Sequence, residues 1–250
     1  MGKGRIIELA SKLSLANLSK RNIPAFDNAS EQELNFLEHI LSEEQRLREK
    51  KRKDVLTVRS KLPEMKCLDD YDLSFQPSLS KWHITKLKET AWIEAIFNII
   101  IVGEAGVGKT HIAVAIGHNA IQNQKKVFYA TTKELLFLCN SKDILTKSRT
   151  RLKYIRECDL VIIDEFGYTP ISKDEGLCLY NLINDINKVT SLVIVTNRVF
   201  SSWGSIFTDE VIAATLIDRI TEKCQIIRLS GNSYRLAKHE NIVKANSCKN

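Results

Sequence analysis

The sequence predicts an α/β fold with a parallel five-stranded sheet, preceded by a small helical domain. Strand-like apolar runs alternate with helical patterns, and 250 residues with 44% hydrophobic content are enough to bury a full α/β core. Runs that are apolar throughout are typical of parallel strands covered on both faces. The five expected strands are residues 97–102, 126–130, 160–165, 192–197 and 225–229.

The residues before the first strand carry helical patterns. Apolar positions recur at helical spacing in residues 5–20, and residues 31–53 form a second expected helix that Ser30 caps. The turn-rich stretch DDYDLSFQPSLS follows at 69–80. We therefore expect a helical N-terminal domain at 1–66, a linker at 67–83 and the α/β domain at 84–250.

The net charge and the hydropathy of the sequence indicate which kinds of partner the protein contacts. The formal net charge of +7 favours contact with phosphate backbones, although the same charge also serves solubility. The sequence contains neither a run of about 18 apolar residues nor the pattern of a signal peptide. We expect a cytoplasmic protein without a membrane partner.

The first expected strand leads into a motif that predicts phosphate binding. Residues 103–110, GEAGVGKT, fit G-x-x-x-x-G-K-[ST] between a strand and a helix. Its glycines let backbone N–H groups face phosphates at the helix N-terminus. Lys109 is expected on the β- and γ-phosphates, and the Thr110 hydroxyl on Mg²⁺. The expected nucleotide-binding residues are Gly103, Glu104, Ala105, Gly106, Val107, Gly108, Lys109, Thr110 and His111.

Two further strands end in polar residues. The run DLVIIDE delivers Asp164 and Glu165 to a carboxyl edge, where ligands of open α/β sheets bind. Asp164 is suited to hold Mg²⁺, and Glu165 to orient and deprotonate the attacking water. Asn197, after the strand LVIVTN, is either a residue that contacts the γ-phosphate or water, or an ordinary turn residue.

Arg219 lies at the end of the apolar helix in ATLIDRITEK, shortly before the last strand. It is either an arginine finger that reaches a neighbour's γ-phosphate or a cation that complements the helix dipole. The guanine-reading pattern NKxD is absent, because NKVT ends in Thr190, and this favours ATP over GTP. Only 21 residues follow the last expected strand, so we expect the C-terminal lid to be reduced or absent.

These motifs in this order resemble AAA+ ATPases, and within them the IstB and DnaC type of small helper proteins. The stretches GVGKTHIAVAIGHNAI, DLVIIDEFGYTPIS, FSSWGSIFTDEVIAATLIDRI and GNSYRL look like the IstB branch. The resemblance implies an αβα sandwich and ATP hydrolysis coupled to self-assembly on duplex DNA. It also implies that the assembly deforms or marks a target site and recruits or stimulates a cognate transposase. By the same resemblance Asn197 is a sensor, Arg219 the finger supplied in trans, and Arg235 a candidate second sensor.

The surface that contacts DNA is predicted from charge. Phosphate contacts need Lys or Arg spread over one face, with readout of backbone and shape rather than bases. The candidate cluster between the second and third strands is Lys142, Lys147, Arg149, Arg151 and Lys153. Its alternatives are a solvated helix face or the rival run REKKRK at 48–53.

Three rival functions stay open at this stage. A helicase loader of the DnaC type would share the ATPase core and differ in its partner. A metabolic P-loop kinase would need a lid for an acceptor substrate, which the sequence does not supply. A catalytically inactive scaffold is disfavoured because Lys109, Asp164 and Glu165 are all present.

Overall fold

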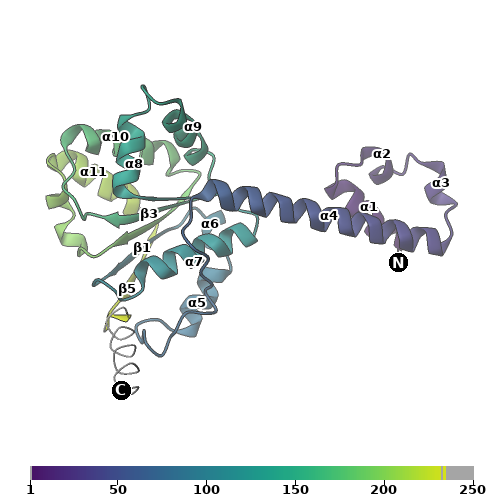
Figure 1. The fold of residues 1–250 in the computed structure, drawn as a ribbon, viewed down its shortest axis with the longest axis horizontal. Helices are drawn as coiled ribbons and strands as arrows, with labels where there is room; N and C mark the ends of the chain where they lie inside the picture. The colour runs from purple at the N-terminus through teal and green to yellow at the C-terminus, as the bar shows by residue number, and fades with distance from the viewer. Residues whose placement is uncertain (1, 232, 235–250) are drawn as a thin grey trace, which may run out of the picture. The chain divides into compact units, whose positions relative to one another are not determined.

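The computed structural model describes residues 2–231 and 233–234 (Figure 1). The chain divides into two compact units, Met1–Val55 and Leu56–Asn250. This boundary lies upstream of the expected one at residue 66. The difference arises because Leu56, Leu68 and Leu79 are buried in the core of the second unit, so the residues expected as a linker belong to the α/β domain.

Helices make up the N-terminal unit: α1 (Gly2–Lys12), α2 (Ala16–Ser19), α3 (Pro24–Asp27) and the first part of α4 (Glu31–Ser60). The single helix expected over 5–20 is divided, and Ser14 in the break has φ 62°. Ser30 caps α4 as expected: its N–H donates to the Glu33 carboxylate at 2.8 Å, and its hydroxyl accepts from the Glu33 N–H at 3.4 Å. The core of this unit comprises Ile6, Leu9, Ala10, Leu13, Leu18, Phe26 and Leu41.

The second unit is built on a parallel sheet in the order β2-β3-β4-β1-β5. All five expected strands are present within a residue or two of their predicted bounds. They are β1 (Asn98–Gly103), β2 (Val127–Thr131), β3 (Leu160–Phe166), β4 (Ser191–Thr196) and β5 (Cys224–Leu229).

Helices cover both faces of this sheet (Figure 1). One hydrophobic cluster contains Ile99 and Ile101 and joins the sheet to α5 (Lys81–Lys88), α6 (Ala91–Glu94) and α7 (Lys109–Gln122). The other contains Ile100, since side chains alternate along a strand. It joins the opposite face to α8 (Thr132–Asn140), α9 (Thr146–Ile155), α10 (Lys173–Ile186) and α11 (Glu210–Thr221).

The parallel arrangement brings the chemistry-bearing residues to one edge. β1 runs into the glycine loop, β3 ends with Asp164 and Glu165, and β4 ends immediately before Asn197. The register between β3 and β4 shifts between Ile163 and Phe166, and Glu165 has φ 57°. Such a β-bulge redirects a side chain and is common beside active sites. No helix in the described part of the chain is long and apolar enough to cross a membrane.

Candidate nucleotide-binding site

The glycine loop has the backbone that phosphate binding requires. Gly106 and Gly108 adopt left-handed conformations, with φ 82° and 96°. Gly108 is the N-cap of α7 and has no side chain to accept from the first-turn N–H groups of that helix. These donors suit an anionic ligand, and the positive end of the helix dipole adds to the attraction.

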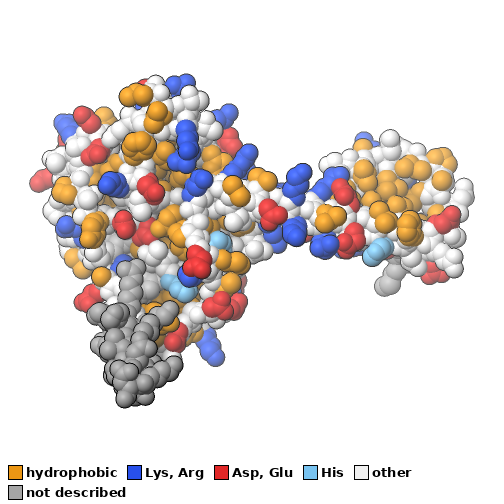
Figure 2. All heavy atoms as spheres, viewed as in Figure 1, with side chains coloured by type: hydrophobic (Ala, Val, Ile, Leu, Met, Phe, Trp, Pro, Cys, Tyr) orange, Lys and Arg blue, Asp and Glu red, His pale blue; other side chains and the backbone are white. Residues whose placement is uncertain are grey.

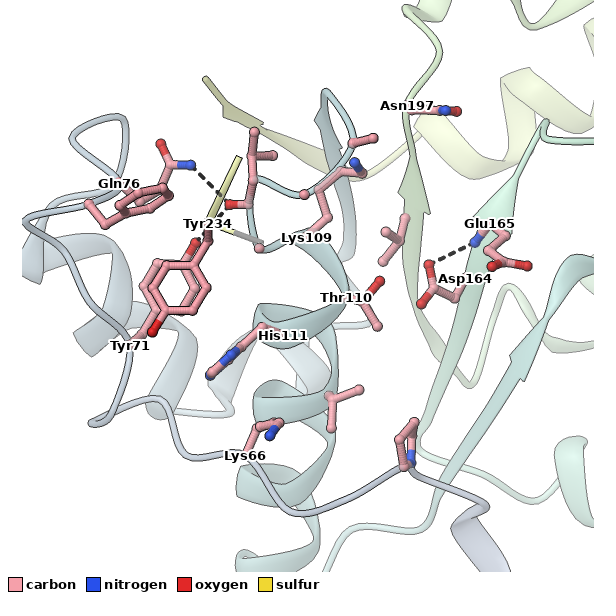
Figure 3. Close-up of a pocket in the computed structure, with 18 of the residues that line it drawn as sticks. Lys66, Tyr71, Gln76, Lys109, Thr110, His111, Asp164, Glu165, Asn197 and Tyr234 are labelled. Carbon is pink, nitrogen blue, oxygen red and sulfur yellow. Dashed lines mark hydrogen bonds between the residues drawn. The ribbon is translucent and has the colours of Figure 1, made fainter. Parts of the chain in front are cut away.

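A cavity of about 680 Å³ opens beside this loop. Seven of the nine expected nucleotide-binding residues, 105–111, line it together with Asp164, Glu165 and Asn197 (Figure 3). Lys109 lies over the loop and its Nζ donates to the Glu104 carbonyl at 2.6 Å. The volume of the cavity and the first-turn N–H groups of α7 fit a nucleoside triphosphate.

The Asp164 carboxylate is buried and held from two sides. Its Oδ1 accepts the Glu165 N–H at 2.7 Å, and its Oδ2 accepts the Tyr129 hydroxyl at 2.9 Å. Burial is the main cause that raises the pKa of Tyr129, with the Asp164 charge as the next cause, so the phenol stays a proton donor at neutral pH. Thr110 lines the same cavity, and a carboxylate with a hydroxyl is a donor set that fits Mg²⁺.

Glu165 differs from Asp164 in its surroundings. Its side chain is exposed at the cavity, beyond the bulge in β3. The two neighbouring acids therefore face different tasks: Asp164 is fixed by hydrogen bonds, whereas the Glu165 carboxylate is accessible to water. This division fits a metal-binding acid beside a general base.

Hydrogen bonds tie the ends of β3 and β4 together below Asn197. The Thr196 hydroxyl donates to the Phe166 carbonyl at 2.7 Å and accepts the Arg198 N–H at 3.0 Å. Arg198 Nε donates to the Gly167 carbonyl at 2.7 Å. Asn197 itself is exposed and lines the cavity just beyond the end of β4, and its side chain points away from Lys109 and Thr110 (Figure 3).

Some predicted site residues do not line this cavity in the part of the chain that the structure describes. Gly103 instead permits the close approach of β5, because an added Cβ would lie 2.4 Å from the Leu229 carbonyl oxygen. Glu104 contributes the carbonyl that Lys109 contacts. Arg219 lies in the last turn of α11, and its buried Nε has no hydrogen-bond partner among the described residues. Arg235 lies outside the described residues.

The basic cluster lies away from the cavity. Lys142 is in the turn after α8, and the other four members are on α9. Arg151 is half-buried and the remaining four side chains are exposed.

The stretch expected as a linker contributes contacts that sequence reasoning missed. The Tyr71 hydroxyl and Gln76 Nε2 both donate to the Val107 carbonyl, at 3.4 and 3.1 Å. The Tyr71 ring packs edge-on against His111, with centroids 5.4 Å apart. Burial, and secondarily Lys66, lowers the pKa of His111, which keeps the imidazole neutral at pH 7. The available signal was the apolar content of residues 67–83, which include three aromatic residues and three leucines: Tyr71, Phe75, Trp82, Leu68, Leu73 and Leu79.

The hydrogen bond from Tyr129 to Asp164 leads to a prediction that one substitution can test. The Tyr129→Phe variant removes the donor to Asp164, so we expect the Mg²⁺ concentration for half-maximal ATP turnover to rise about 10-fold. The turnover rate at saturating Mg²⁺ and the melting temperature should stay close to wild type. Tyr154→Phe is the control, since Tyr154 is half-buried and outside the set of cavity-lining residues. An unchanged Mg²⁺ requirement in Tyr129→Phe would contradict this role.

The sheet order, the glycine loop and the Asp-Glu pair at one carboxyl edge define the AAA+ P-loop class. In agreement, the structure of the DnaC helicase loader superposes with a TM-score of 0.51 at 19% identity, covering 66% of this chain and 96% of that chain. The family model for IstB-like ATP binding proteins matches residues 9–242. This chain therefore belongs to the IstB-like ATP-binding family.

Two relatives match along nearly the whole chain. A Bacteroides fragilis protein, named as an ATP-binding protein of an IS21-like insertion sequence, is 31% identical over 243 residues, covering 96% of this chain and 92% of its own length. A Pseudomonas aeruginosa protein, named for insertion sequence IS21 and ATP binding, is 30% identical over 234 residues, covering 91% and 87%.

Proposed function

We propose that this protein hydrolyses ATP to control its own assembly on duplex DNA, where it deforms or marks a site for a cognate transposase. The observation that carries the proposal is the single cavity shared by the phosphate loop, Asp164, Glu165 and Asn197. Phosphoryl transfer requires mainly positioning and charge compensation, and these residues supply both.

Each side chain has a role that follows from its place. Lys109 and the first-turn N–H groups of α7 hold the β- and γ-phosphates of ATP, while Thr110 and Asp164 would hold Mg²⁺, which neutralises charge on these phosphates when bound. Glu165 takes a proton from the attacking water because its carboxylate is accessible to solvent. Asn197 orients that water or the γ-phosphate.

Arg219 is proposed to act on the neighbouring subunit, as an arginine finger. It lies on α11 outside the set of residues that line its own cavity, and the described residues give its buried Nε no partner. A complete site would then form only between two copies of the chain. Hydrolysis would thereby depend on assembly.

Mixing two inactive variants tests the finger. Arg219→Ala should bind ATP normally and lose about 10³-fold in turnover, and Glu165→Gln should be inactive because it lacks the base. In mixed assemblies, an Arg219→Ala cavity beside a Glu165→Gln neighbour is complete, so mixing should restore part of the activity. Normal turnover in Arg219→Ala alone would instead show that Arg219 is not a finger and only complements the helix dipole of α11. Absence of rescue would contradict action in trans.

The basic cluster of α9 and its preceding turn is the proposed DNA surface. Its five cations make no ion pair within residues 2–231 and 233–234, which leaves their charges available to phosphates. DNA affinity should therefore fall steeply as salt rises, because bound counterions are released on association.

The partner is proposed from the relatives, which are named for insertion sequences. If this chain also belongs to an insertion sequence, a transposase is the favoured partner. The alternative, a helicase loader, is favoured only by the likeness of fold to DnaC. Purification with a transposase rather than a replicative helicase bound would support the first function.

A further inference from the structure

The turn between α8 and α9 presents apolar side chains to solvent. Ile144 is 83% exposed and Leu145 42%, and Phe137 near the end of α8 is 59% exposed. We call these three residues with Lys142, Lys147 and Arg149 the apolar-basic tip. Exposed apolar side chains that are gathered at one turn are common at surfaces that bind another molecule.

Hydrogen bonds hold this tip in shape. The Ser141 hydroxyl donates to the Phe137 carbonyl at 2.6 Å and accepts the Ser148 hydroxyl at 2.7 Å, and both serine side chains are buried. The N–H groups of Ile144 and Leu145 both donate to the Ser141 carbonyl, at 3.2 and 2.8 Å. The fold therefore presents Ile144 from a pre-formed turn, so little ordering is needed when a partner binds.

Charge indicates which partner fits. Lys142 precedes Ile144 by two residues and Lys147 follows it by three, and the sole acid between residues 142 and 153 is Asp143. Blue and orange side chains lie together over the α8 and α9 side of the domain (Figure 2). Two such tips would repel each other, which disfavours a second copy of the same surface. A polyanion with an apolar interior, such as the stacked bases of DNA, fits both features.

We propose that the apolar-basic tip grips the phosphates of duplex DNA while Ile144 inserts as a wedge at a base step. Apolar wedges of this kind unstack neighbouring base pairs and kink the duplex. The inference rests on the proposed DNA-binding function and adds the means by which bound DNA is deformed. Ile144 then deforms the bound duplex, whereas Lys142, Lys147 and Arg149 give the protein its affinity for the DNA phosphates.

The experiment uses the full chain with ATP and a 30-base-pair duplex that carries 2-aminopurine, whose fluorescence rises when it is unstacked. Wild type should raise the fluorescence on binding, and Ile144→Ser should lose most of that rise. Affinity in Ile144→Ser should fall by less than about threefold, because the lost burial is offset by the unstacking that no longer occurs. Ile144→Met keeps an apolar wedge and should retain the rise.

Val189→Ser is the matched control, since Val189 is 61% exposed in the turn after α10. Bound wild type without a fluorescence rise, or a full rise in Ile144→Ser, would overturn the wedge and leave the proposed function standing. Ile144→Ser that binds DNA but no longer forms the ATP-dependent complex on it would instead assign the tip to contact between copies, and it too would overturn the wedge. Wild type that binds no DNA would overturn the proposed function itself.

Discussion

Replacing Lys109 by Ala is expected to weaken ATP binding by about 100-fold and to abolish ATP-dependent assembly on DNA. Lys109 lines the cavity, and its ammonium is held over the phosphate loop by the Glu104 carbonyl. Removing one partner of a hydrogen-bonded charge pair costs about 2–5 kcal/mol, and each 1.4 kcal/mol corresponds to about tenfold in affinity. Titration with a fluorescent ATP analogue measures the loss directly.

Lys188→Ala is the control for this loss. Lys188 is exposed in the turn after α10, and its substitution removes the same charge at a position outside the cavity. ATP should raise the melting temperature of wild type and Lys188→Ala, since a ligand that binds only the folded state stabilises it. The same ATP concentration should raise that of Lys109→Ala much less. Assemblies that form undiminished in Lys109→Ala would show that nucleotide does not control them.

Replacing Glu165 by Gln is expected to reduce ATP turnover by about 10²- to 10⁴-fold while ATP binding persists. Glutamine keeps the size of the side chain, so the strained backbone at φ 57° and the bulge in β3 are retained. The amide cannot take a proton from water, and the ATP-bound assembly should accumulate on DNA. Phosphate release and native electrophoresis of the DNA complexes measure the two effects separately.

Glu222→Gln, an exposed change just after α11, is the matched control and should turn over normally. If Glu165→Gln instead fails to bind DNA, the link between the ATP-bound state and assembly is contradicted. Normal hydrolysis of ATP by this variant would show that Glu165 is not the general base.

The strands and their shared edge could be predicted because the evidence for them is local. Buried parallel strands are apolar along their whole length, and the polar residue that follows each strand marks its carboxyl end. Asp164, Glu165 and Asn197 were therefore expected at the same edge as the glycine loop, and they line one cavity with it.

The contacts that were missed depend on register and on long-range packing. Tyr129 reaches Asp164 because β2 and β3 pair with Tyr129 opposite Ile162, and no periodicity in the sequence sets that register. Tyr71 lies in a turn-rich stretch whose composition predicts a linker. Its contact with Val107 accompanies the burial of Leu68 and Leu79 in the same hydrophobic cluster as α7.

The most direct test of the account is the mass of the purified protein, measured by mass photometry with and without duplex DNA, in ATP, in ADP and without nucleotide. Control of assembly by nucleotide predicts a large complex only when ATP and DNA are present together. A monomer under every condition would contradict both the assembly and the arginine finger supplied in trans.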